Sequence, residues 1–336
     1  MRNDTPTGPP RDRYRSHAAP NDSKELEMTE PSTHDLATRD PSTRDPATDP
    51  STHDPSAQDV GDWYDRFGDL YALTMGDSMH LGMWAGGTRE AIGGLTADAM
   101  WKELTQAQDA WTDTLIEEVG LLPGQQMLDV GCGTGRPTVR IAERSGGSVL
   151  GVTVSGAQTQ AGRVRATRAG LSERVTFTRA DAMDLPQPSE SFDAAWAIES
   201  FAHFSDRPAA IREVWRVLRP GGRFVLADCY EAVPFTQEEL GLFRAAFALS
   251  RLPVEAANYS DMLKEAGFTI RNSRDMSSEF KPTYDLIPSL FAARRNQIAE
   301  LVGREAMAQL DAIYPRILTL CRDKMGYVMV SAEKGQ

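Results

Sequence analysis

The chain has 336 residues and carries a formal net charge of −12, with a pI near 5.0. This acidic balance argues against nucleic acid as a partner, because phosphates need a basic surface, and no apolar run approaches the roughly 20 residues that cross a bilayer. The three cysteines have no metal-type spacing and the first thirty residues lack an apolar signal core, so we expect a cytoplasmic protein with reduced thiols.

The first sixty residues form an acidic leader that is rich in Asp, Pro, Ser and Thr. Within it, "DPSTRDPATDPSTHDPSAQD" (Asp40–Asp59) is a degenerate repeat with almost no large apolar residue. Such a segment cannot bury enough surface to offset its ordering entropy. We therefore predict that residues 1–60 are disordered, and we favour a flexible leader over a partner-binding tail.

Residues 61–121 are predicted to form an N-terminal helical segment. Aromatic residues recur in "DWYDRFGDLYALTMGDSMHLGMW" (Asp62–Trp84), where order is expected to begin. The following stretch, Thr96–Leu121, has the period of an amphipathic helix. The residues on its apolar face are Met100, Leu104, Ala107, Trp111, Leu115 and Val119.

From residue 122 to 230, apolar strands alternate with amphipathic helices. This alternation predicts an α/β fold with a parallel sheet covered on both faces. The predicted strands are Gln125–Gly131, Ser148–Val154, Val175–Asp181, Phe192–Ser200 and Gly222–Tyr230, and the predicted helices end at Arg144 or span Ala157–Ala169 and Arg207–Leu218.

The segment 231–324 is predicted to be a helical cap over the substrate, with returning strands at the sheet edge. Helical patterns cover Thr236–Arg251 and Tyr259–Phe268, and two more lie in "PSLFAARRNQIAELVG" and "MAQLDAIYPRILTLCRD". The final segment, 325–336, contains the alternating run Met325–Lys334, which is typical of a last antiparallel strand.

A glycine-rich turn, "DVGCGTG" (Asp129–Gly135), joins the first strand to its helix. Such a turn lets the backbone approach a ligand and points a helix N-terminus at it. A nicotinamide dinucleotide would need an acid at the end of the second strand, but that strand ends in "GVTVS". Pro137 also removes a backbone donor near the helix start. A ligand without phosphates fits better, and S-adenosylmethionine is such a ligand.

Six motifs in order resemble the class I S-adenosylmethionine-dependent methyltransferases. They are "HLGMW", "LDVGCGTGRPTVRIA", "GVTVSGAQ", "RADAMDLP", "FDAAWAIESFAHF" and "REVWRVLRPGGRFVLAD". Within that class the chain is similar to bacterial natural-product enzymes such as the rebeccamycin sugar O-methyltransferase, and to tocopherol and sarcosine-type methyltransferases. The resemblance spans Asp62–Lys334. It implies a Rossmann-like fold with a seven-stranded, mostly parallel sheet and an S-adenosylmethionine-binding core over 122–230.

The resemblance also implies which residues hold the cofactor. The three glycines leave room for its amino-acid end, and Asp129 orients the loop or accepts from the cofactor amine. Hydroxyl and amide groups replace the usual ribose-binding acid, and Asp181 accepts from the adenine amine. The full expected set is Tyr64, Trp84, Asp129, Gly131, Gly133, Gly135, Thr153, Ser155, Gln158, Asp181, Ala182, Met183 and Ala197.

Methyl transfer from a sulfonium needs no metal, but an oxygen nucleophile must lose a proton. We expect His203 to be the general base, Asp228 to orient or assist it, and Glu199 to contact cofactor or acceptor. The related sugar enzyme carries "ESLHHM" where this chain has "ESFAHF", so Ala202 replaces the first histidine. The alternative reading is that His203 is a structural histidine and that Asp228 caps the next turn.

Three functions stay open at this point. The first is an O-methyltransferase acting on a hydroxyl of an apolar or glycosylated small molecule of secondary metabolism. The second is a C-methyltransferase acting on a prenyl or isoprenoid carbon. The third is a cofactor-binding protein without transferase activity, for example a relative of the pericyclases. The expected partner is a small-molecule acceptor, with neither nucleic acid nor membrane, and a homo-oligomer remains an option.

Overall fold

The structure is a computed structural model that describes residues 54–84 and 95–336. Most of the predicted disordered leader therefore lies outside the described residues. The predicted boundary after residue 60 is too late, because helix α1 begins at Ala57 and is capped by Ser56. The Ser56 hydroxyl accepts from the Asp59 N–H, and the Asp59 carboxylate accepts in return from the Ser56 N–H.

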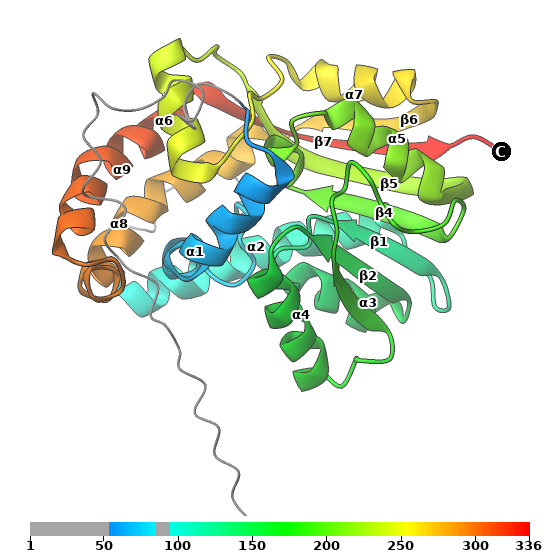
Figure 1. Ribbon diagram of the computed structural model, residues 1–336, viewed down its shortest axis with the longest axis horizontal. Coiled ribbons are helices and arrows are strands. Elements are labelled where there is room, and N and C mark those ends of the chain that lie inside the picture. Colours follow the sequence, from blue (N-terminus) through cyan, green and yellow to red (C-terminus); the bar gives the residue numbers. More distant parts are fainter. Residues whose placement is uncertain (1–53, 85–94) are drawn as a thin grey trace, which may run out of the picture. The chain divides into compact units, whose positions relative to one another are not determined.

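A seven-stranded sheet forms the centre of the described chain, in the order β3-β2-β1-β4-β5-β7-β6 (Figure 1). The first five strands pair in parallel, whereas β7 is antiparallel to both β5 and β6. The mixed sheet agrees with the expected α/β class. The strands are β1 (Gln126–Val130), β2 (Ser148–Thr153), β3 (Val175–Arg179), β4 (Phe192–Ile198), β5 (Leu218–Glu231), β6 (Phe268–Asp275) and β7 (Met325–Lys334).

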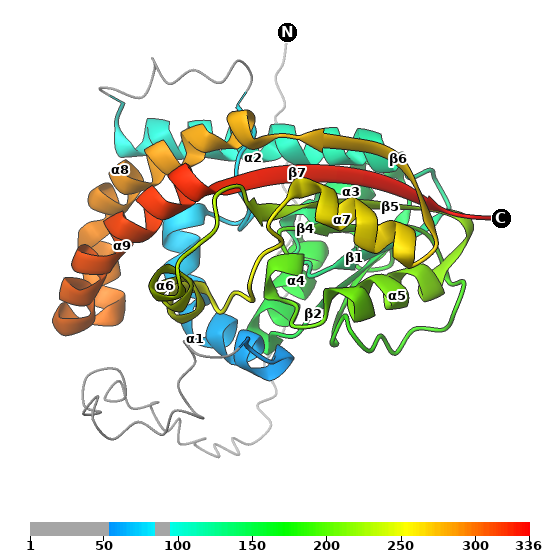
Figure 2. The same ribbon diagram turned by 90° about the horizontal axis from the view of Figure 1, so that it is seen from above.

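Helices cover both faces of this sheet, as Figure 2 shows from above. In β1, Met127 packs into the core that contains side chains of α2 and α3, and Leu128 packs into the opposite core beneath α5 and α7. This alternation follows from the period of two in a strand. These helices and α4, which packs along β2 and β3, are α2 (Ala97–Val119), α3 (Arg136–Ser145), α4 (Gly156–Arg168), α5 (Arg207–Val217) and α7 (Ala256–Glu265).

Four helices gather beyond the carboxyl ends of the strands: α1, α6, α8 and α9 (Figure 1). Their bounds are Ala57–Met75, Gln237–Phe247, Ser277–Val302 and Arg304–Lys324. The predicted cap is corrected at helix α7, which lies within 231–324 but packs on the sheet. Strand β6 is a returning strand at the sheet edge, as predicted. The N-terminal helix α1 packs against α8 and completes the cap.

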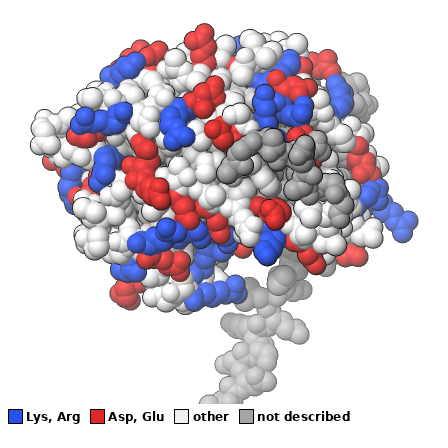
Figure 3. Space-filling view, turned by 180° about the vertical axis from the view of Figure 1, so that it is seen from behind, with Lys and Arg blue, Asp and Glu red and all other residues white. Residues whose placement is uncertain are grey.

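Acidic and basic side chains are interspersed over the described part of the face seen in Figure 3. None of the helices in residues 54–84 and 95–336 combines the length and apolarity that crossing a membrane requires.

Candidate active site

The glycine turn after β1 adopts backbone conformations that favour glycine. Gly131 and Gly133 have φ angles of 78° and 53°. Gly135 caps α3 with φ 78°, and a Cβ atom there would lie 2.5 Å from the Phe177 ring. Gly131 and Gly133 line a cavity, but Gly135 does not. Gly135 permits close packing of α3 on the sheet, and its expected cofactor role stays a prediction.

The first cavity opens at the carboxyl edge of β1, β2 and β4 and holds about 750 Å³ of space between atoms. This volume includes space that is open to solvent. The Ser78 hydroxyl lies on its wall, is almost fully buried, and has no hydrogen-bond partner among the described residues. The expected site residues on this wall are Tyr64, Asp129, Gly131, Gly133, Thr153, Gln158, Ala182, Glu199 and His203.

Polar groups on this wall are held by short hydrogen bonds. The Thr138 hydroxyl donates to Asp129 at 2.6 Å, and the Thr153 hydroxyl donates to Gln158 Oε1 at 2.6 Å. Burial raises the pKa of Asp129 to about 7, against the lowering effect of the Thr138 hydrogen bond. Asp129 is thus placed to exchange a proton or accept a donor near neutral pH.

Two further residues expected at the cofactor serve other elements. The Trp84 indole N–H donates to the Thr283 hydroxyl at 2.9 Å, and its ring packs between α2 and α8. Ser155 is the N-cap of α4 and donates to Asp65 at 2.5 Å. Neither residue lines the cavity.

The segment that is expected to bind adenine lies beside the first cavity. Ala182 lines the cavity, but Asp181 and Met183 are not on its wall. One oxygen of Asp181 accepts from the Met183 N–H at 2.9 Å, which closes a local turn. The Met183 side chain packs against the core beneath α5, and Ala197 is buried in the same core. The second Asp181 oxygen has no hydrogen bond among the described residues, and the expected adenine contact of Asp181 stays a prediction.

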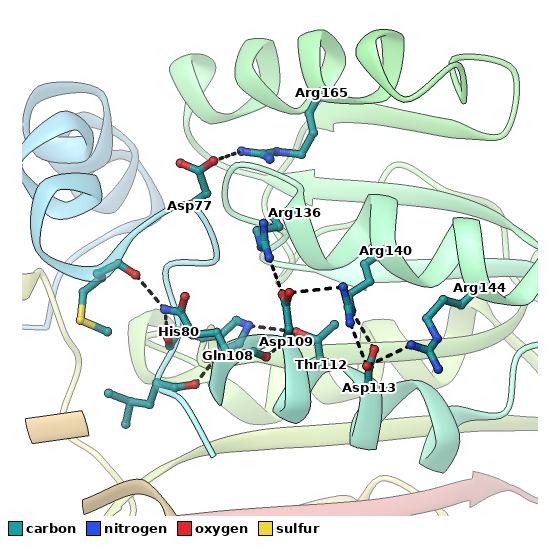
Figure 4. Close-up of polar contacts among 12 residues, drawn as sticks. Asp77, His80, Gln108, Asp109, Thr112, Asp113, Arg136, Arg140, Arg144 and Arg165 are labelled. Atoms are coloured by element: carbon teal, nitrogen blue, oxygen red, sulfur yellow. Dashed lines mark hydrogen bonds and ion pairs between the residues drawn. The ribbon is translucent and has the colours of Figure 1, made fainter. Parts of the chain in front are cut away.

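A polar network fixes the segment that leads from α1 to the cavity (Figure 4). The Gln108 amide donates to the carbonyls of Met75 and His80, each at 2.7 Å. His80 Nε2 lies 3.2 Å from the Thr112 hydroxyl. Burial lowers the pKa of His80 to about 4, so the ring is neutral at physiological pH. His80 lines the cavity as a structural histidine.

Ion pairs on the same side join α2 to α3 (Figure 4). Arg140 forms a two-point pair with Asp113 at 2.7 and 2.8 Å, and Arg136 pairs with Asp109. Farther along, Arg165 of α4 pairs with Asp77 at 3.0 Å. The first pairs hold α3 against α2, and the Arg165–Asp77 pair holds α4 against the segment before His80.

A second cavity of similar volume lies beneath the helical cap. Its wall is mostly apolar and aromatic, and it includes side chains from α1, α6, α8 and α9. These are Trp63, Tyr71, Phe243, Phe247, Tyr284, Ile287, Tyr314 and Leu318. Four residues line both cavities: Tyr64, Met79, Glu199 and His203. The two cavities therefore meet at one shared wall.

At the shared wall, His203 is held by a hydrogen bond on each ring nitrogen. Nδ1 lies 3.0 Å from the Ala248 carbonyl oxygen, which can only accept, so Nδ1 carries the proton. The lone pair of Nε2 then accepts from the Tyr64 hydroxyl at 3.0 Å. Burial lowers the pKa of His203 to about 4, and burial raises that of Tyr64 well above its usual value. The neutral pair presents a proton acceptor to both cavities.

Asp228 does not orient His203 as expected. One carboxylate oxygen accepts from the N–H groups of Phe201 and Ala202 at 2.7 and 3.3 Å, and the other accepts from the Cys229 N–H. It has no hydrogen bond to His203 among the described residues. Burial raises the pKa of Asp228 to about 6. Asp228 lines the second cavity and caps the short helix η4 (Phe201–His203).

Glu199 directly follows β4 in a left-handed conformation, with φ 51°. For a residue with a side chain this conformation is strained, which is common at functional sites. Its carboxylate accepts from the Leu81 N–H at 2.8 Å. Burial, together with the nearby Asp228, raises the pKa of Glu199 to about 8.

Sequence reasoning did not identify Ser78, which lines the first cavity, or Met79, which lines both cavities. Ser78 and Met79 precede the "HLGMW" motif, and the sequence gives no chemical reason to single out either residue. Met79 has φ 59°, and its sulfur lies near Gly133. Across the described ranges, no group of three or more His, Cys, Asp or Glu side chains is arranged to hold a metal ion.

Comparison with known proteins agrees with this geometry. Residues 128–226 match the family described as "Methyltransferase domain". The chain is similar to methyltransferase GfsG of Streptomyces halstedii, with 32% identity over 82% of this chain and 94% of that protein. It is also similar to the 27-O-demethylrifamycin SV methyltransferase of Amycolatopsis mediterranei, with 33% identity over 82% and 97% of the two chains.

Among solved structures, the chain resembles the [4+2]-cyclase SpnF, with 31% identity and a TM-score of 0.70. The similarity covers 84% of this chain and 98% of that chain. The same fold is thus found in a protein named for a reaction other than methyl transfer.

Proposed function

We propose that this chain, which belongs to the class I S-adenosylmethionine-dependent methyltransferases, methylates a hydroxyl of an apolar small molecule. Its relatives place it in secondary metabolism. We assign the cofactor to the first cavity and the acceptor to the second.

The residues of the first cavity fit the cofactor. Gly131 and Gly133 form a cradle at the turn after β1, and the Ser78 hydroxyl lacks a partner among the described residues. Asp129 and Ser78 would hold the amino-acid end, Thr153 and Gln158 the ribose, and the second oxygen of Asp181 the adenine amine. When bound, S-adenosylmethionine supplies an electrophilic methyl group on a sulfonium.

The observation that carries the proposal is the wall shared by the two cavities. Methyl transfer requires donor and acceptor to face each other along one line. Tyr64, Met79, Glu199 and His203 lie on both walls, so the reacting atoms meet among these four side chains. Two of them, Tyr64 and His203, form the hydrogen-bonded pair that can take up a proton.

The Tyr64–His203 pair favours a hydroxyl acceptor over a carbon one. A hydroxyl must lose its proton as the new C–O bond forms. It can donate to the Tyr64 oxygen while Tyr64 donates to His203, or it can take the place of Tyr64 at Nε2. On either route the proton ends on Nε2, because Nδ1 already carries one.

The second cavity supports an apolar acceptor. Its aromatic and aliphatic wall favours a ring system or a long hydrocarbon, and aromatic faces also suit the apolar face of a glycoside. The named substrate of the rifamycin relative is likewise a natural product.

The proposal is tested with methyl-labelled cofactor and a panel of apolar alcohols, phenols and glycosides. We expect label in a methyl ether, located by mass spectrometry and NMR. Label on a carbon skeleton would replace the proposal with C-methylation. Tight cofactor binding with no labelled product, but with a rearranged or cyclised acceptor, would favour the second candidate, which the 31% identity to a [4+2]-cyclase supports.

A further inference from the structure

The shared wall holds a single carboxyl group. Of the four residues that line both cavities, Tyr64 and His203 are neutral, Met79 is apolar, and Glu199 alone can be an anion. The methyl group to be transferred must lie at this wall, and so must the sulfur that carries it. This inference rests on the proposed placement of the cofactor in the first cavity.

We propose that Glu199 is the counter-ion of the sulfonium and that it distinguishes the charged cofactor from its uncharged product. The two ligands share adenine, ribose and amino acid, and they differ only in the methyl group and the positive charge on sulfur. A carboxylate beside the sulfur attracts the sulfonium and gains nothing from the thioether of S-adenosylhomocysteine.

The surroundings of Glu199 make this attraction effective. Among the described residues no cation is positioned against the carboxylate, which is hydrogen-bonded by the Leu81 N–H and by the Tyr327 side chain. Burial and Asp228 raise the pKa of Glu199 to about 8, so the neutral acid dominates at pH 7. The groups that face it from other elements are Tyr64 and Tyr71 on α1, His203 on η4, Asp228 and Cys229 on β5, Tyr284 on α8 and Tyr327 on β7.

Binding of the sulfonium is therefore coupled to a proton. Glu199 releases its proton to solvent as the positive ligand enters, so the net charge at the wall stays constant. S-adenosylhomocysteine leaves Glu199 protonated. By linkage, the affinity for the cofactor rises with pH until Glu199 is already ionised before the ligand binds. The affinity for the product does not rise. At pH 7 and above, the product is held less tightly than the cofactor, which favours product release.

The test compares the binding of S-adenosylmethionine and S-adenosylhomocysteine by calorimetry, between about pH 6 and pH 9, in buffers of different ionisation enthalpy. For the natural chain we expect the affinity ratio of cofactor to product to increase by up to about tenfold per pH unit below pH 8 and to level off above it, with proton release only for the cofactor. In Glu199→Gln, which keeps an oxygen acceptor for the Leu81 N–H, we expect a nearly constant ratio and unchanged product affinity. Any pH dependence of affinity that remains in Glu199→Gln comes from the titratable groups of the ligands themselves.

Two outcomes separate the inference from the placement on which it rests. Asp181→Ala should weaken both ligands equally, because both carry adenine. If it does so while the natural chain shows a ratio that is constant with pH, or Glu199→Gln keeps the full pH dependence, the counter-ion role is wrong and the placement stands. If Asp181→Ala changes neither affinity, the proposed placement is wrong. Should Glu199→Gln fail to fold, the natural chain's ratio still decides, and Glu199→Asp provides the second variant.

Discussion

At the scale of single residues, the two nitrogens of His203 have different tasks. Nδ1 is tied to the Ala248 carbonyl, and Nε2 faces Tyr64 and the shared wall. The carbonyl, which comes from the segment after α6, thus performs the orienting role that Asp228 was expected to have. Asp228 itself shapes the backbone of η4, from which His203 projects.

His203→Ala should lower turnover on a hydroxyl acceptor by roughly 10²–10⁴-fold, because the proton loses its acceptor. The affinity for S-adenosylhomocysteine should change by no more than about twofold, since no proton is transferred on binding. Tyr64→Phe is the matched variant: it removes one hydroxyl and leaves Nε2 in place, so the loss should be closer to about tenfold. An unchanged turnover in His203→Ala, or a larger loss in Tyr64→Phe than in His203→Ala, would contradict a role for His203 as the final acceptor.

The pH dependence of turnover follows from the lowered pKa of His203. The neutral ring is the base, and acid removes it only as the pH falls through about 4. At saturating cofactor and acceptor, turnover should therefore stay level from pH 8 down to about pH 5. A decline in turnover centred near the ordinary histidine pKa of about 6.5 would mean that the base is not a buried His203 with a lowered pKa.

Sequence reasoning identified the glycine turn, Glu199 and His203 because their local motifs carry chemical information. It could not pair Tyr64 with His203, which lie 139 positions apart. For the same reason it placed Trp84 at the cofactor, whereas Thr283 of α8 receives its indole N–H. A local sequence pattern does not show which distant segments come into contact.

At the scale of elements, α1 forms part of both cavities because it lies close to the end of β2. Gly61 permits this approach: a Cβ atom there would lie 2.8 Å from the Val154 carbonyl oxygen. Four residues further along α1, the Asp65 carboxylate accepts from the Ser155 hydroxyl and from the Ala157 N–H at the start of α4. Burial alone would raise the pKa of Asp65, but these hydrogen bonds lower it.

Gly61→Ala should push α1 away from β2, with a destabilisation of about 1–3 kcal/mol from overpacking and weaker cofactor binding. Gly68→Ala is the control in the same helix, because a Cβ there meets no atom within 4 Å. That change should stabilise the protein by roughly 0.5–1 kcal/mol through helix propensity alone. Denaturant unfolding and calorimetry measure the two effects, and similar results for both variants would refute the packing role of Gly61.

Long periodic elements were predicted well, and irregular ones were not. The predicted last strand agrees with β7, and the long helix after Thr96 agrees with α2. Helix α8 begins at Ser277, upstream of the predicted start. The prediction was late because Pro282 and Pro288, which lie inside the helix, resemble helix boundaries in the sequence. Strand β6 was not identified separately, because its exposed, polar sequence is that of an edge strand.

At the scale of the whole described chain, residues near its two ends line the same cavity. Trp63 and Met325 lie on the wall of the second cavity together with residues of every cap helix. The alternation of strands and helices was enough to predict the sheet. The acceptor site was not predictable to the same degree, because it exists only once α1, α8 and α9 have packed together.

Deleting residues 325–336 should abolish folding, because β7 is buried and pairs with β5 on one side and β6 on the other. Circular dichroism and size-exclusion chromatography would show the loss. Deleting only Gly335 and Gln336, which follow the strand and are exposed, should leave the melting temperature within about 2 °C. A folded protein after the longer deletion would show that the first five strands form an independent sheet.

The place of β7 also sets the order of events during synthesis. The ribosome makes β5 and β6 before the strand that lies between them, so in a nascent chain one edge of β5 and both edges of β6 are unpaired until β7 emerges. Those edges attract other chains. Chaperone supply or slow translation during expression should therefore influence the yield of native protein more than the stability of the finished molecule does.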